Sequence, residues 1–211
     1  MSHGLAKRTV TLVCGVSQSG KSTFALRYMI NAPIAYRFVF DPGTGSESYA
    51  HRLNCDAAAD EYQLSLALCR GWVLFNPHRM FPGRAADAFN FFCDWAFAMS
   101  ERLPGRKLLM IDEAWRYVTG RRYPDEVANC VQAGGHHGLE CCFNTQRPHE
   151  IHEAIKNECS ELVCFTLHGD KSLDWIKSQG HNPEEVTHLE KLQFVARAID
   201  SGAELRGRIK I

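Results

Sequence analysis

Residues 15–22 have the types and spacing that bind the phosphate chain of a nucleotide. They read Gly-Val-Ser-Gln-Ser-Gly-Lys-Ser and match the pattern G-x-x-x-x-G-K-S/T. Glycines let backbone N–H groups approach phosphates, and a helix that begins at the loop adds the positive end of its dipole. The spacing predicts that Lys21 reaches the β- and γ-phosphates and that the Ser22 hydroxyl binds Mg²⁺. The residues expected to contact the nucleotide are Gly15, Val16, Ser17, Gln18, Ser19, Gly20, Lys21, Ser22 and Thr23.

Two acidic residues, Asp112 and Glu113, follow the apolar run 108–111. Placed at the carboxyl end of a buried strand, they would lie on the ligand side of an open α/β sheet. We expect Asp112 to support Mg²⁺ and Glu113 to polarise a water for attack on the γ-phosphate. Adjacent carboxylates are costly unless a cation compensates them, and Mg²⁺ would do so. A strand with a solvated acidic end is the alternative, but the phosphate loop upstream favours ATP hydrolysis.

The chain must supply strands and helices that position these motifs. Residues 9–14 are β-branched and apolar, which predicts a buried parallel strand, and residues 23–30 have helical spacing. Further apolar runs predict strands over residues 37–40, 72–75, 108–111, 140–144 and 162–166. Helices are predicted over residues 46–53, 60–69, 85–102, 124–133, 149–157 and 171–178, with a short one after Asn182 and a terminal hairpin over 194–211. This alternation predicts a three-layer α/β fold with a mainly parallel sheet.

Composition limits the possible classes of protein. The chain has 211 residues, which suits a single domain spanning residues 1–211. Its 24 basic and 24 acidic residues balance, so any contact with nucleic acid must come from a local basic patch. Nine scattered cysteines favour free thiols in a reducing compartment. We see no signal peptide and no apolar run long enough to span a membrane.

The order of motifs resembles a known superfamily. The phosphate loop is followed by Asp41-Pro42 after the second strand, Asp112-Glu113, a Gly-Gly-x-x-Gly turn over residues 134–138, and Thr-Gln-Arg-Pro over 145–148. This order is similar to the FtsK/HerA superfamily of DNA-pumping ATPases and covers about residues 10–176. The short length looks most like the genome-packaging ATPases of tailless, membrane-containing icosahedral viruses. The resemblance implies an additional-strand P-loop NTPase fold of the RecA/FtsK type.

The resemblance also implies a mechanism and partners. The strand that bears Gln146 would lie between the strands of the phosphate loop and of Asp112, so that Gln146 senses the γ-phosphate. The family implies a ring, usually a hexamer, that translocates double-stranded DNA without reading its sequence. Capsid or portal-vertex proteins would be further partners, in the host cytoplasm or in association with the virion.

The chain departs from the family at one position. FtsK-type translocases place an arginine at the start of the strand after Thr-Gln-Arg-Pro, whereas this chain has Glu161 and Leu162 there. The arginine that a neighbouring subunit inserts into the site must then come from elsewhere. The candidates are Arg116, Arg121, Arg122 and Arg147.

Other functions stay open at this point. A partner-dependent assembly ATPase related to zonula occludens toxin would share the Asp-Glu-Ala-Trp stretch, but such proteins usually carry a transmembrane anchor. A small-molecule kinase would need an acceptor pocket, and Glu113 fits activation of water better. A nucleotide-binding switch with little turnover is a more remote alternative.

Three further sets of side chains have plainer interpretations. Asp41 is either a turn residue or a member of the ligand face. Histidines and cysteines between residues 136 and 159 suggest zinc, but no C-x-x-C pair occurs and buried thiols are the simpler interpretation. Arg206, Arg208 and Lys210 alternate on one face of the last strand, where they either contact DNA or form a solvated edge.

Overall fold

A computed structural model describes residues 10–210, with the side chain of residue 47 left aside. All of its strands form one eight-stranded sheet in the order β3-β2-β4-β5-β1-β6-β7-β8. The strands are β1 Val10–Cys14, β2 Tyr36–Phe40, β3 Trp72–Phe75, β4 Lys107–Ile111, β5 Leu139–Thr145, β6 Glu161–Cys164, β7 Gln193–Ala198 and β8 Glu204–Arg208. Strands β1 to β6 pair in parallel, whereas β7 and β8 form an antiparallel hairpin on the edge of β6. The predicted α/β class and the terminal hairpin are therefore confirmed.

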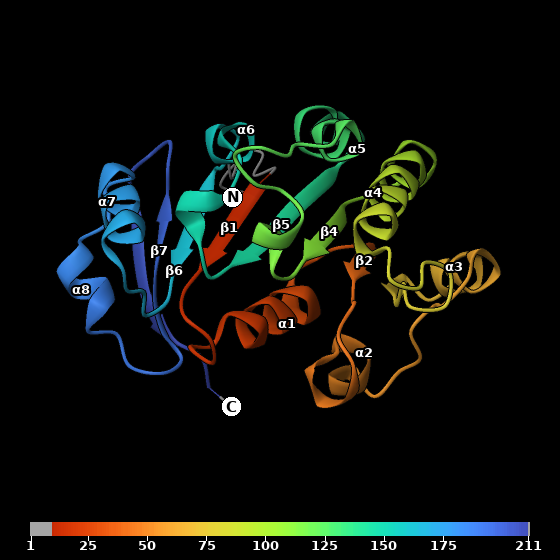
Figure 1. Cartoon of the computed structure of the whole chain (residues 1–211), viewed down its shortest axis with the longest axis horizontal. Helices are drawn as coiled ribbons and strands as arrows, with labels where there is room; N and C mark the ends of the chain where they lie inside the picture. Colours follow the sequence, from red (N-terminus) through yellow and green to blue (C-terminus); the bar gives the residue numbers. More distant parts are fainter. Residues whose placement is uncertain (1–9, 211) are drawn as a thin grey trace, which may run out of the picture.

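Helices cover both faces of the sheet, which gives the predicted three layers (Figure 1). The helices are α1 Lys21–Asn31, α2 Tyr49–Leu53, α3 Glu61–Leu68, α4 Ala85–Arg102, α5 Asp125–Ala128, α6 Glu153–Asn157, α7 Asp170–Ser178 and α8 Pro183–Thr187. Buried side chains of α4 to α8 pack on one face, and those of α1 and α2 pack on the other. Consecutive residues of the buried strand β5 point to opposite faces, so Cys141 and Cys142 belong to different cores.

The aromatic helix α4 matches its predicted span of 85–102. Phe89 and Phe92 are fully buried, and Trp95, Phe97 and Met99 pack against the same core. The aromatic stripe is thus part of the core rather than an exposed surface for stacking bases.

Two predicted helices are divided in the structure. In place of a helix over 46–53 the chain forms a 3₁₀ turn, Gly45–Glu47, and then α2, because the Ser48 side chain caps the helix by accepting from His51 N at 3.3 Å. In place of a helix over 149–157 the chain forms the 3₁₀ turn Pro148–Glu150 and then α6, whose cap is the His152 side chain. The predicted helix 124–133 continues from α5 into a π-helical turn, Asn129–Ala133.

Two expectations about chain organisation stay predictions. The predicted first strand includes Thr9, which lies outside the described residues, as does Ile211 at the end of the predicted hairpin. The division into one domain over residues 1–211 is likewise a prediction. Within residues 10–210, no helix combines the length and apolar character that a membrane span requires.

Candidate functional site

The phosphate loop joins β1 to α1 and is held by the two strands beside β1 (Figure 1). Gly15 N donates to Thr145 O at 3.2 Å, and Val16 N donates to Thr166 O at 2.8 Å. A Cβ on Gly15 would lie 2.7 Å from the Cβ of Phe165. The loop thus has its shape because a glycine at position 15 allows the segment that follows β6 to lie directly against it.

Lys21, the first residue of α1, points back into the loop. Its side chain is buried, and its Nζ donates to Val16 O at 2.8 Å. Burial lowers the pKa of Lys21, while the nearby carboxylates of Glu113 and Asp112 raise it. The ammonium therefore lies between the loop backbone and the predicted acidic residues.

Asp112 follows β4 and lies against the start of α1. Ser22 Oγ donates to Asp112 Oδ2 at 3.0 Å, and Glu113 N donates to Asp112 Oδ1 at 2.9 Å. The structure thus brings together the two side chains that the sequence predicts as Mg²⁺ ligands. Both side chains offer oxygen atoms as ligands, which is the ligand type that Mg²⁺ prefers.

Glu113 and Gln146 are in direct contact. Strand β5 lies between β1 and β4, as the resemblance implies, and Gln146 follows its carboxyl end. Gln146 Nε2 donates to Glu113 Oε1 at 2.6 Å, and Trp115 Nε1 donates to Glu113 Oε2. Glu113 has a φ of 50°, a left-handed conformation that is uncommon for a non-glycine residue. The carboxylate of Glu113 is therefore fixed by two donors from different segments.

These side chains surround a pocket of about 820 Å³. A pocket of this size lies within the range of about 300–1,000 Å³ that is typical of small-molecule sites. The predicted site residues that line it are Ser17, Gln18, Gly20, Lys21, Ser22, Thr23, Asp112, Glu113, Arg116 and Gln146. Gly15, Val16 and Ser19 belong to the same loop but do not line the pocket.

Tyr49, on α2, is a member of the site that the sequence did not indicate. Its hydroxyl donates to Asp112 Oδ2 at 2.9 Å and accepts from Asn144 Nδ2 at 3.4 Å. Burial, and next the charge of Asp112, raise the pKa of Tyr49 well above its ordinary value, so the phenol remains a donor. Asp112 is thus held by three donors.

Asp41 fixes the start of α2. Its carboxylate accepts from Ser48 Oγ at 2.9 Å, from Tyr49 N at 3.0 Å and from Ala50 N at 2.9 Å. It also lines the pocket. Asp41 therefore belongs to the ligand face and also holds the start of α2, whereas the structure has no turn at this residue.

The four arginine candidates differ in position. The guanidinium of Arg116 lies 5.6 Å, and that of Arg147 4.5 Å, from the centroid of the Trp115 ring. Arg147 also pairs with Glu150 at 3.2 Å. Arg121 and Arg122 lie in or beside the turn closed by the Thr119–Arg122 bridge. Only Arg116 among the four lines the pocket.

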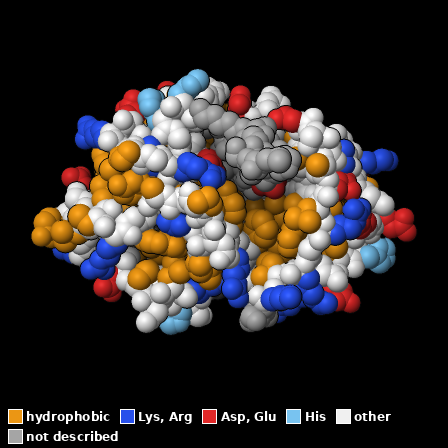
Figure 2. Space-filling view, turned by 180° about the vertical axis from the view of Figure 1, so that it is seen from behind, with side chains coloured by type: hydrophobic (Ala, Val, Ile, Leu, Met, Phe, Trp, Pro, Cys, Tyr) orange, Lys and Arg blue, Asp and Glu red, His pale blue; other side chains and the backbone are white. Residues whose placement is uncertain are grey.

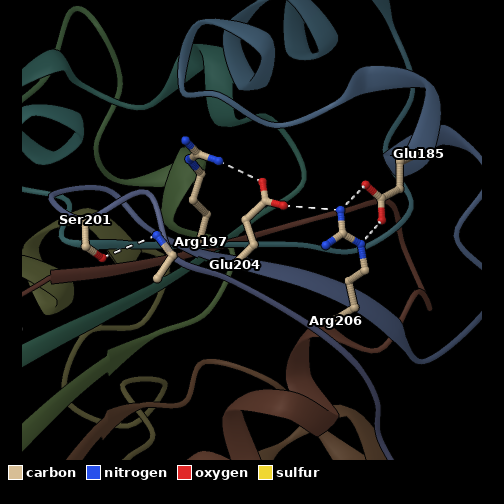
Figure 3. Close-up of polar contacts among 6 residues, drawn as sticks. Glu185, Arg197, Ser201, Glu204 and Arg206 are labelled. Atoms are coloured by element: carbon tan, nitrogen blue, oxygen red, sulfur yellow. Dashed lines mark hydrogen bonds and ion pairs between the residues drawn. The ribbon is translucent and has the colours of Figure 1, made fainter.

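The basic side chains of β8 are paired with acids. Figure 3 shows Arg206 between Glu185, whose two oxygens it contacts at 2.5 and 2.9 Å, and Glu204 at 3.2 Å. Arg208 pairs with Glu190 at 2.7 Å. On the face shown in Figure 2, basic and acidic side chains are interspersed around hydrophobic ones. These pairs favour a solvated edge over a DNA contact for the hairpin.

No group of three or more histidine, cysteine or acidic side chains in residues 10–210 is arranged to hold a metal. The cysteines of this part of the chain are free thiols. Burial raises the pKa of the Cys141 and Cys142 thiols well above the ordinary range, so they stay protonated.

Comparison with protein-family models gave no match, and comparison with curated proteins gave none either. Solved structures share the fold. The genome-packaging NTPase B204 from Sulfolobus turreted icosahedral virus 2, in complex with sulfate, aligns with a TM-score of 0.77 and 17% identity over 98% of this chain and 99% of that chain. VirB4 of Thermoanaerobacter pseudethanolicus aligns with a TM-score of 0.68 and 10% identity over 96% of this chain and 89% of that chain.

The bacterial conjugative coupling protein TrwBΔN70 aligns with a TM-score of 0.60 and 10% identity over 100% of this chain and 87% of that chain. At such identities the alignments establish a common fold. The chain therefore has the P-loop NTPase fold of the genome-packaging NTPase B204, as its resemblance to the FtsK/HerA superfamily predicts.

Proposed function

We propose that the chain binds ATP with Mg²⁺ and hydrolyses it to ADP and phosphate. One observation carries the proposal: a single pocket brings together Lys21, the Ser22–Asp112 pair and the Glu113–Gln146 pair. These are the groups that ATP hydrolysis requires, namely a cation for the phosphates, oxygen ligands for the metal and a base for water. The neighbour B204 is known in complex with AMP, AMPPCP and ATP-γS, which supports a nucleotide as the ligand.

Mg²⁺ fits the residues at the start of α1. The Ser22 hydroxyl and the Asp112 carboxylate would hold it, since both offer oxygen atoms as metal ligands and these atoms already lie 3.0 Å apart. When bound, the ion would neutralise charge on the phosphates. Tyr49, which donates to the same carboxylate oxygen as Ser22, and the Glu113 N–H, which donates to the other one, fix the orientation of Asp112.

The remaining residues have distinct roles. Backbone N–H groups of the phosphate loop and the ammonium of Lys21 bind the phosphates. Glu113 accepts a proton from the water that attacks the γ-phosphate, and the leaving group is ADP. Gln146 can both donate to a phosphate and accept from water, so it orients the attacking water beside Glu113. Trp115 holds the second oxygen of Glu113 in place.

The finer proposal is that ATP hydrolysis drives movement of double-stranded DNA, in the setting of viral genome packaging. The fold that the chain shares with B204, a genome-packaging NTPase, supports this proposal. We infer a ring, hexameric in the simplest case, with capsid or portal-vertex proteins as partners, in the host cytoplasm or on the virion. Contacts to DNA would be made through the backbone, since a motor must move along any sequence.

The decisive experiment is steady-state ATP hydrolysis with and without long double-stranded DNA, at low and moderate salt, on protein of known oligomeric state. DNA stimulation that weakens with salt would support a motor that contacts phosphates. Hydrolysis in an assembled ring that ignores DNA would refute translocation and favour the partner-dependent assembly ATPase. Phosphate transfer to a small acceptor would favour a kinase instead.

A further inference from the structure

Arg52, on α2, contacts Thr23, which directly follows the phosphate loop. One of its terminal nitrogens donates to Thr23 Oγ1 at 3.1 Å, and Thr23 directly follows the predicted Mg²⁺ ligand Ser22. The guanidinium lies 5.8 Å from the centroid of the Tyr49 ring. Arg52, Thr23 and Lys21 all line the same pocket. A second cation is therefore present beside the loop, from a segment 29 residues away in the sequence.

The charge of Arg52 is not compensated by a carboxylate among the described side chains. Several arginines in residues 10–210 pair with acids, such as Arg79 with Asp60 and Arg206 with Glu185, whereas Arg52 lines the pocket without such a pair among the described side chains. A guanidinium carries five N–H donors in a planar fork that matches the oxygens of a phosphate. The one described hydrogen bond of the Arg52 guanidinium goes to a hydroxyl, which leaves most of these donors available to a ligand in the pocket.

Helix α2, which carries Arg52, is held in place by two acidic residues, Asp41 and Asp112. Asp41 accepts three hydrogen bonds from the start of α2, and Tyr49 donates to Asp112. Tyr49 and Arg52 are three residues apart and so lie on the same side of the helix. The position of the guanidinium is thus set by the same contacts that set Asp112, and a positioned cation loses less entropy on binding.

We propose that Arg52 binds the phosphate chain of the nucleotide, as a cation supplied by the same subunit. The inference rests on the proposed function, because it presumes that a nucleotide occupies this pocket. It adds a residue to the binding site that no sequence motif marks, and it is independent of the four arginines predicted to act between subunits.

The test is calorimetric binding of adenosine, AMP, ADP and ATP, the last with Mg²⁺, to four proteins. These are the wild-type chain, Arg52→Gln, Arg52→Lys and the control Arg102→Gln. Gln at position 52 keeps an N–H donor but removes the charge, and Lys keeps the charge without the fork. Arg102 is exposed at the end of α4 and does not line the pocket.

We expect Arg52→Gln to bind ADP or ATP about ten- to a hundred-fold more weakly, the range for a charge-assisted hydrogen bond. Adenosine should bind equally to all four proteins, Arg52→Lys should show only part of the loss, and Arg102→Gln should match the wild type. The melting temperature without nucleotide should not change in Arg52→Gln, whereas its increase on adding saturating nucleotide should be smaller. The shortest of AMP, ADP and ATP that binds Arg52→Gln more weakly than it binds the wild type identifies the phosphate that Arg52 contacts.

Two results would overturn the inference alone. One is wild-type affinity of Arg52→Gln for both ADP and ATP. The other is an equal loss for adenosine together with a lower melting temperature, which would mean that Arg52 only holds α2 against Thr23. If the wild-type chain binds none of the four ligands, the proposed function itself fails, and that outcome is recognised before any variant is compared.

Discussion

Gly15→Ala should destabilise the chain because the loop has no space for a Cβ at this position. The added carbon would lie 2.7 Å from the Cβ of Phe165 and 2.8 Å from Ser19 Oγ, at a φ of 157°. Phe165 is fully buried, and its Cβ cannot move without its backbone. Overpacking of this kind costs about 1–3 kcal/mol. A left-handed φ adds about 1–2 kcal/mol for an L-residue. We therefore expect Gly15→Ala to lower the free energy of unfolding by about 2–5 kcal/mol.

Two other glycines separate the steric cost from the backbone cost. Gly83 has a φ of 71° but nothing within 4 Å of an added Cβ, so Gly83→Ala measures the cost of a positive φ without a steric clash. Gly120 has open space and no positive φ, so Gly120→Ala should be near neutral. Urea unfolding gives the free energy of unfolding of the three variants, which can be compared directly as long as their m-values are equal. The steric reasoning is refuted if Gly15→Ala is no less stable than Gly83→Ala.

Three further predictions concern the acids, the phenol and a buried histidine. Glu113→Gln should bind ATP normally while turnover falls by orders of magnitude, and normal turnover in a steady-state assay would remove Glu113 from the mechanism. Tyr49→Phe should lower the free energy of unfolding by about 1–3 kcal/mol, because Asp112 loses a donor and Asn144 an acceptor; an unchanged urea midpoint would contradict this. Burial lowers the pKa of His181, so the unfolded chain binds more protons in mild acid and stability should fall as the pH falls from about 7 to 5. His181→Gln should flatten that dependence in urea unfolding at several pH values, and an equal slope would argue against the assignment.

The sequence predicted the bounds of long elements with a strong hydrophobic pattern. The helix over residues 85–102 has apolar residues at helical spacing and Pro104-Gly105 after it, and the structure gives the same bounds. The strand over 72–75 is also confirmed. The position of β5 between β1 and β4 came from the resemblance instead, since no local pattern reports which strands pair.

The bounds of short helices were harder to predict, because a single capping residue decides where such a helix begins. Ser46 and Ser48 both fit a helix start after Asp41, and the structure uses Ser48 because its hydroxyl also donates to the Asp41 carboxylate. That contact joins residues seven apart through a turn and is invisible to helical periodicity. A five-residue helix such as α2 has too few positions to show a periodic face.

This difference explains which site residues could be predicted. Asp112 and Glu113 follow an apolar strand, and a parallel sheet brings the carboxyl ends of its strands to one edge, so their position after the strand was enough to predict a place in the site. Gln146 was predicted from the resemblance instead. Tyr49 and Arg52 reach the site from α2 through contacts with residues 63 and 29 positions away. Their roles depend on how Asp41 orients that helix over the loop. The sequence therefore predicted residues at the edge that the sheet builds, and the structure was needed to find the residues of α2 that pack over it.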